Sequence, residues 1–200
     1  TDVPDIWRDE LEQNSDWLRF SFHSYANDPP FPYDNAVADK VLADYRAVMA
    51  QMRRIAGKAA TDVTTTLHYV CATKEACIAL RKEGVCGLIG MFLPMDDRRA
   101  LRYYLTSQQA CSLQQHRLWH DSETDISFLC NNIVLNAVSL DEIPSLLLRQ
   151  SSNIYHVMIH EQYFYPDYID YQPDFEKKIA AAISFFQTLD FKSCFFEELI

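Results

Sequence analysis

The chain has 200 residues, a formal net charge of −10 and 48% hydrophobic residues, so it can bury a globular core without help from disulfides. The acidic excess argues against nucleic acid as a partner, because binding a phosphate backbone requires clustered Lys and Arg. Only 4 glycines are present, and neither a dinucleotide-binding motif nor a Walker motif occurs.

The six cysteines show no CxxC spacing and mostly stand in apolar segments, which is typical of reduced, buried side chains in a cytosolic protein. Neither a signal peptide nor a long apolar run is visible, so we expect a cytoplasmic protein without membrane contact. The chain begins at Thr1 instead of a methionine, and we therefore expect that the N-terminus is incomplete.

Strand-like and helix-like segments alternate along the chain. The hydrophobic patterns predict strands at residues 16–23, 64–70, 85–92, 100–106, 125–130, 154–160 and 191–196. They predict helices at residues 3–13, 36–56, 73–83, 107–116, 140–150 and 174–189. This alternation indicates an α/β fold, a largely parallel sheet covered by helices, in a single domain over residues 1–200.

Three of the predicted strands carry a histidine at or near their carboxyl end, namely His23, His68 and His160. In each strand, the two-residue alternation puts the histidine on the less apolar face. Ligands bind at the carboxyl ends of parallel strands, so the three histidines predict a polar or metal site there.

The segments that carry these histidines are WLRFSFHSYANDPPFPY (17–33), TTTLHYV (64–70) and VMIHEQYFYPDYIDYQPDF (157–175). In order and spacing they resemble a divergent branch of the polysaccharide deacetylase (NodB-homology) superfamily, over roughly residues 5–199. The resemblance implies an irregular (β/α) barrel and a metal-dependent hydrolase that removes acetyl groups from sugars. The family's first strand, which carries an Asp pair, has no counterpart here; it is either missing from the chain or lost in this branch.

The resemblance implies a site for one divalent metal, zinc or a similar ion. His23 fits the first histidine of the family's His-x-x-x-His metal motif. Asn27 stands where the second histidine belongs, and the adjacent Asp28 can supply an oxygen ligand. The implied metal ligands are therefore His23, Asn27 and Asp28.

The resemblance also implies catalytic residues. His160 fits the family's late histidine, the general acid that protonates the leaving group. Glu161 follows it and is expected to orient a neighbour or to pair with an arginine, because adjacent strand residues point to opposite faces. His68 stands where the family usually has an Arg- and Pro-containing segment, and it is a further acid–base candidate.

Aromatic residues surround these motifs. Sugars stack on aromatic rings and hydrogen-bond to tyrosine hydroxyls, which makes Tyr25, Tyr163 and Tyr165 candidates for substrate binding. The sequence indicates equally that these side chains pack within their long loops instead of binding a substrate.

Three functions stay open at this point. The first is metal-dependent hydrolysis of C–N or ester bonds in acetylated sugars. The second is a catalytically degenerate barrel that binds carbohydrate or a protein partner, favoured by Asn27 and by the absent Asp pair. The third is metal-independent acid–base catalysis by His68 and His160. If a strand is absent, a second subunit is expected to cover the open edge, which predicts a homodimer.

Overall fold

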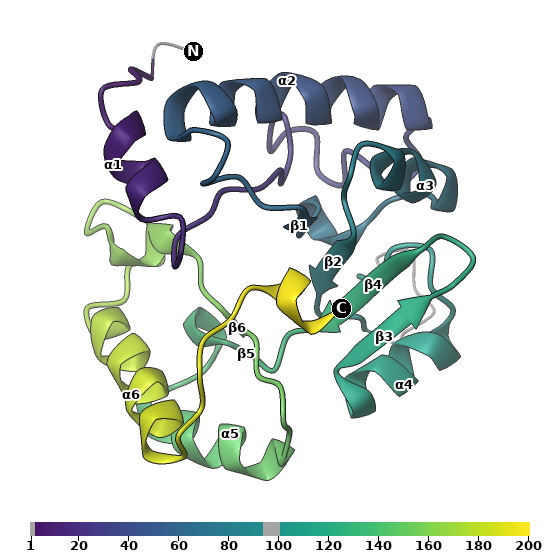
Figure 1. Ribbon diagram of the computed structural model, residues 1–200. Helices are drawn as coiled ribbons and strands as arrows, with labels where there is room; N and C mark the ends of the chain where they lie inside the picture. Colours follow the sequence, from purple (N-terminus) through teal and green to yellow (C-terminus); the bar gives the residue numbers. More distant parts are fainter. Residues whose placement is uncertain (1–2, 94–100) are drawn as a thin grey trace. The chain divides into compact units, whose positions relative to one another are not determined.

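The computed structural model describes residues 3–93 and 101–200, and its contacts group the chain into two compact units (Figure 1). Unit 1 comprises Thr1–Cys130 together with Cys194–Ile200, and unit 2 comprises Asn131–Ser193. Each unit has a hydrophobic core of its own, so each is described separately.

Unit 1 is built on a four-stranded sheet with the strand order β1-β2-β4-β3. Its strands are β1 (Thr64–Thr65), β2 (Gly87–Gly90), β3 (Leu118–Asp121) and β4 (Ile126–Cys130). β1, β2 and β4 are parallel, and β3 pairs with β4 in the antiparallel direction. Every residue of β4 is buried, as expected for a parallel strand covered on both faces.

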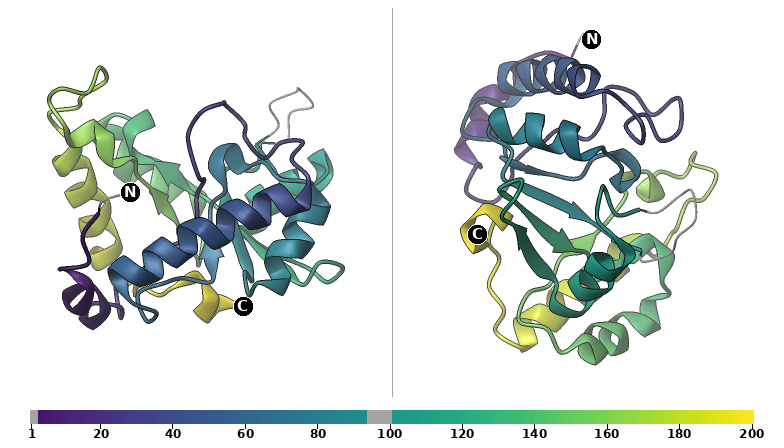
Figure 2. Two further views of the ribbon diagram at one scale, coloured as in Figure 1. Left: turned by 90° about the horizontal axis from the view of Figure 1, so that it is seen from above. Right: turned by 90° about the vertical axis from the view of Figure 1, so that its right-hand side faces the viewer.

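Helices cover the sheet of unit 1. They are α2 (Ala38–Ala56), α3 (Lys74–Lys82) and α4 (Ser107–His116), with the 3-10 helices η1 (His68–Val70) and η5 (Phe196–Leu199). The short helix α1 (Arg8–Gln13) has no buried residue and contacts α2. The long helix α2 lies beside α3 (Figures 1 and 2). Its buried residues Val41, Tyr45 and Met49 share one face and join the core that contains Leu88 and Phe128 of the sheet.

Unit 2 contains a two-stranded parallel sheet and two main helices. Its elements are β5 (Ile133–Val134), η2 (Leu135–Ala137), η3 (Leu140–Glu142), α5 (Ile143–Gln150), β6 (Val157–Met158), η4 (Glu161–Phe164) and α6 (Phe175–Thr188). Ile143 and Leu147 of α5 pack with Phe175 and Ala182 of α6. The buried Lys178 ammonium donates hydrogen bonds to the Val138 carbonyl at 2.7 Å and to Gln172 Oε1 at 2.8 Å.

The α/β class predicted from the sequence is confirmed, and five of the predicted helices are present within a few residues of their expected bounds. The strand expected at 16–23 is wrong, because that segment contributes only a single parallel bridge from Phe20 to Thr61. The final strand expected at 191–196 is also wrong, since that segment has no regular structure before η5 begins at Phe196.

Of the strand predicted at 100–106, residue 100 lies outside the described residues, and 101–106 contain no strand. Neither sheet closes into a barrel within the described residues, because their order leaves edge strands on both sides. None of the helices described is both long and apolar enough to cross a membrane.

Candidate functional site

Two of the predicted strand-end histidines lie together in unit 1. His23 follows the bridge at Phe20, and His68 begins η1 just beyond the carboxyl end of β1. The backbones pair here, because the His68 N–H donates to the His23 carbonyl at 3.1 Å and the Thr65 hydroxyl donates to the Phe22 carbonyl. The two histidines therefore occupy the expected carboxyl edge, although His23 reaches it from an irregular segment.

The two imidazoles are in direct hydrogen-bond contact. His23 Nε2 lies 2.9 Å from His68 Nδ1, and His23 Nδ1 lies 2.5 Å from the Thr66 carbonyl oxygen. A carbonyl can only accept, so His23 Nδ1 carries a hydrogen; in the neutral pair, His23 Nε2 then accepts from His68 Nδ1. Burial lowers the pKa of His68, as does the neighbouring His23, while a hydrogen bond to the Asn27 backbone opposes both.

Two aromatic rings extend the cluster, one in contact with His68 and the next stacked on the first. The Tyr69 ring lies 4.3 Å from the His68 ring between centroids, and Phe31 stacks on Tyr69 at 4.0 Å. Phe31, Tyr69 and the next residue, Val70, all have left-handed backbone φ angles, of 58°, 60° and 53°. Strained residues of this kind persist only where surrounding contacts hold them, and they gather at functional sites.

The metal site predicted at His23, Asn27 and Asp28 is incomplete in the structure. Asn27 and Asp28 are exposed, and the contact of Asn27 with His68 is made by its backbone. A catalytic zinc ion needs three protein ligands, whereas the pair offers two imidazoles. Across residues 3–93 and 101–200, no group of three or more His, Cys, Asp or Glu side chains could hold a metal ion. We therefore derive no chemical step through a metal.

The other predicted catalytic residues belong to unit 2. His160 Nδ1 lies 2.8 Å from Asn136 Oδ1, which fixes the orientation of this imidazole. Glu161 is exposed at the start of η4. The strand β6 already ends at Met158, so the alternation of faces does not govern these two residues. Asn136 could not be found from the sequence as a partner, because no periodic pattern marks it.

The predicted substrate-binding tyrosines differ in their surroundings. Tyr25 in unit 1 is 66% exposed, and Tyr165 in unit 2 is 56% exposed. Tyr163 packs against the core of unit 2, with its ring 5.9 Å from that of Phe175. Tyr163 therefore has a packing role, while Tyr25 and Tyr165 offer rings that a ligand can reach.

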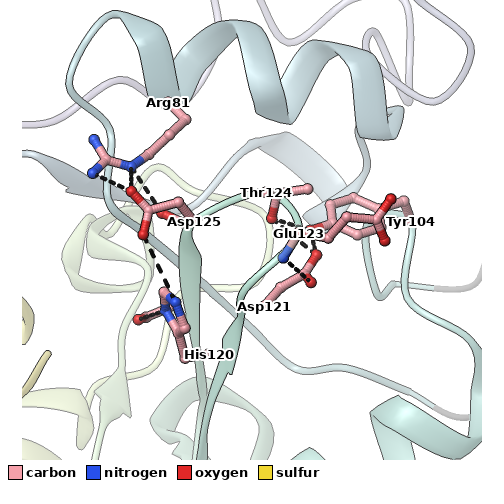
Figure 3. Close-up of polar contacts among 8 residues, drawn as sticks. Arg81, Tyr104, His120, Asp121, Glu123, Thr124 and Asp125 are labelled. Carbon is pink, nitrogen blue, oxygen red and sulfur yellow. Dashed lines mark hydrogen bonds and ion pairs between the residues drawn. The ribbon is translucent and has the colours of Figure 1, made fainter.

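A second polar cluster lies at the turn between β3 and β4 (Figure 3). The Tyr104 hydroxyl donates to Asp121 Oδ2 at 2.6 Å and also contacts the Thr124 hydroxyl at 2.7 Å. Arg81 Nη2 pairs with Asp125 Oδ2 at 2.6 Å. The cluster fixes the turn by joining it to neighbouring elements, and sequence patterns gave no signal for it.

No family model matches the chain, and neither a curated protein nor a solved structure is significantly similar to it.

Proposed function

We propose that the chain is a carbohydrate deacetylase-like hydrolase that cleaves C–N or ester bonds of acetylated sugars, with His23 and His68 at its reactive centre. The observation that carries the proposal is the 2.9 Å hydrogen bond between their rings at the carboxyl end of β1. The motif resemblance supports the same assignment and an irregular (β/α) barrel that lacks its first strand.

The pair is suited to general acid–base catalysis. A neutral imidazole takes a proton from water as the water oxygen attacks the acetyl carbonyl carbon, and its hydrogen-bonded partner stabilises the imidazolium that forms. The proton then passes to the leaving amine or hydroxyl as the C–N or C–O bond breaks, which releases acetate and the deacetylated sugar. The catalytic role expected for His160, which Asn136 orients within unit 2, stays a separate prediction.

Hydrolysis is tested with 4-nitrophenyl acetate and N-acetylglucosamine oligomers. We expect acetate release by the wild type and a loss on the order of 10²-fold to 10⁴-fold in His68→Gln. His116→Gln is the control, because His116 is exposed at the end of α4. Equal turnover by wild type and His68→Gln would contradict the proposal.

A bound divalent metal belongs to the proposal as a separate prediction. Elemental analysis of the purified wild type and of His23→Ala checks it. Near-stoichiometric metal in the wild type that is lost in the variant would support a metal site at His23 despite the incomplete set of ligands around it. Equal metal content in both proteins would exclude His23 as a ligand.

The exposed aromatic side chains favour a second candidate, a domain that binds carbohydrate without cleaving it. Tyr25 and Tyr69 are 66% and 38% exposed, and Tyr69 directly contacts the His68 ring. Calorimetric binding of N-acetylglucosamine oligomers that is weakened in Tyr25→Ala, without acetate release by the wild type, would favour this candidate.

A further inference from the structure

We propose that Tyr103 is a positioning residue for His68. It lies 35 residues further along the chain (103 − 68), and no sequence motif marks it. The inference rests on the proposed function, because it concerns the same pair of histidines. Tyr103 touches neither imidazole and acts through the backbone segment that carries His68.

Tyr103 is bonded to both ends of the segment Leu67–Val70. The Leu67 N–H donates to the Tyr103 hydroxyl oxygen at 3.2 Å, and the Tyr103 N–H donates to the Val70 carbonyl at 2.7 Å. The hydroxyl in turn donates to the Ile89 carbonyl of β2 at 2.8 Å. One residue therefore fastens the start and the end of the segment, and it anchors the start to the sheet.

The anchor itself is firmly held. Tyr103 is buried, and its ring lies 5.7 Å from that of Phe92 and 5.9 Å from that of Phe128. Its hydroxyl oxygen therefore has a fixed position in the core, where an unpaired donor or acceptor is unfavourable. A residue that does not touch His68 can fix the position of His68 only if it is itself held rigidly.

The segment needs such an anchor because its backbone is strained. Val70 has a φ of 53°, which is unfavourable for a β-branched residue, and Tyr69 before it has a φ of 60°. Contacts with surrounding residues must therefore offset the free-energy cost of this strained backbone. Gly90 of β2 leaves the space that this turn occupies, since a Cβ built on Gly90 would lie 2.3 Å from Val70 Cγ1.

Removal of the Tyr103 hydroxyl should therefore displace His68. Tyr103→Phe leaves the ring packing but deprives the Leu67 N–H of its acceptor and the Ile89 carbonyl of its donor. The start of the strained segment then loses its hydrogen-bonded link to β2, and the His68 ring shifts away from His23 Nε2.

Histidine ring nitrogens report this shift directly. We would record the long-range ¹H–¹⁵N spectra of the ¹⁵N-labelled full chain for wild type, Tyr103→Phe and Tyr104→Phe. Tyr104 is a matched control, because its hydroxyl also has two partners, Asp121 and Thr124, but these lie outside the segment. The ring signals of His23 and His68 should move in Tyr103→Phe alone, while those of the other four histidines stay in place.

Unchanged His23 and His68 signals in Tyr103→Phe would overturn the inference, as would an equal shift of all the histidine signals. If Tyr103→Phe does not fold, Gly90→Ala perturbs the same segment from β2 and must move the same two signals. Unmoved signals in that variant would also overturn it.

Acetate release measured on the same proteins separates this inference from the proposed function. Tyr103→Phe should lose on the order of 10-fold to 100-fold in kcat, with a smaller change in KM, and Tyr104→Phe should retain wild-type values. Absence of hydrolysis in the wild type would refute the proposed function, whereas the ring signals would still decide whether Tyr103 positions His68.

Discussion

The histidines of this chain differ in their hydrogen-bond partners. His23 and His68 bond to each other, and His160 bonds to Asn136. By contrast, Nδ1 of His156 is buried and has no partner among the described residues, and burial lowers the pKa of His156 to about 4. The rings of the first three are oriented by hydrogen bonds, whereas His156 is expected to affect stability.

We predict that His156 makes the protein less stable in acid. Its pKa is about 4 when folded against 6.5 for the free side chain, so between these values the unfolded state binds the extra proton. The contribution is fully present above pH 6.5 and is lost as the pH falls toward 4, by up to about 3 kcal/mol. His156→Leu should flatten the decline of the free energy of unfolding over this range, measured by urea titration at several pH values.

The exposed His116 provides the control for this prediction, since His116→Leu should retain the wild-type pH dependence. A decline of equal steepness in His156→Leu and wild type would show that other groups cause the acid sensitivity.

The meeting of His23 and His68 followed from their positions at the ends of predicted strands, even though the first strand shrinks to one bridge. The partners of the histidines were beyond such reasoning. Thr66 contributes a backbone carbonyl, which every residue possesses, and Asn136 stands in a short 3-10 helix without periodicity. Residue type marks reactive side chains, but the groups that orient them depend on tertiary contacts.

Helix boundaries in this chain are set by local side-chain contacts. Thr106 precedes α4 and forms a capping box: its hydroxyl accepts from the Gln109 N–H at 3.2 Å, and Gln109 Oε1 accepts from the Thr106 N–H at 2.9 Å. Thr73 accepts from the Ala76 N–H in the same way at the start of α3. Such contacts explain why both helices begin close to where the sequence predicts.

We predict that Thr106→Ala lowers the free energy of unfolding by about 1 kcal/mol, because the Gln109 N–H loses the Thr106 hydroxyl as its acceptor. Thr106→Ser should recover most of the loss, since serine caps as well. Gln108→Ala, at an exposed position within the same turn, is the control and should change stability little. Urea unfolding measures all three, and equal stability of Thr106→Ala and wild type would contradict the prediction.

Strands were harder to predict than helices because their pairing is long-range. β6 has two residues, and its register is set by β5, which lies more than twenty residues earlier in sequence. β3 was not predicted, since Leu118–Asp121 contains Trp119 and His120 without a clear alternation; it exists because β4 provides an antiparallel partner.

Residues 194–200 belong to unit 1, although the whole of unit 2 lies between them and the rest of unit 1 in the sequence. The Arg19 guanidinium pairs with Glu197 and lies 3.7 Å from the centre of the Phe195 ring. Phe196 is 6% exposed and packs on β2, where a Cβ on Gly87 would lie 2.5 Å from Phe196 Cε1. Unit 2 is thus an insertion within the sequence of unit 1.

We predict that Phe196→Ala destabilises unit 1 by about 3–5 kcal/mol, because it leaves a cavity over the sheet. Ile200→Ala, at a side chain that is 48% exposed, should change the free energy of unfolding by less than about 0.5 kcal/mol. Hydrogen exchange of the β2 amides locates the effect. Equal protection of these amides in the two variants would contradict the assignment of Phe196 to the core.

The return of residues 194–200 to unit 1 has a consequence for biosynthesis. A ribosome makes all of unit 2 before it reaches Phe196, so the residues of unit 2 are available for folding while unit 1 still lacks its last segment. Arg19 can pair with Glu197 only after the 178 residues that follow Arg19 have been synthesised. The β2 surface around Gly87 therefore stays uncovered in the nascent chain until Phe196 emerges from the ribosome.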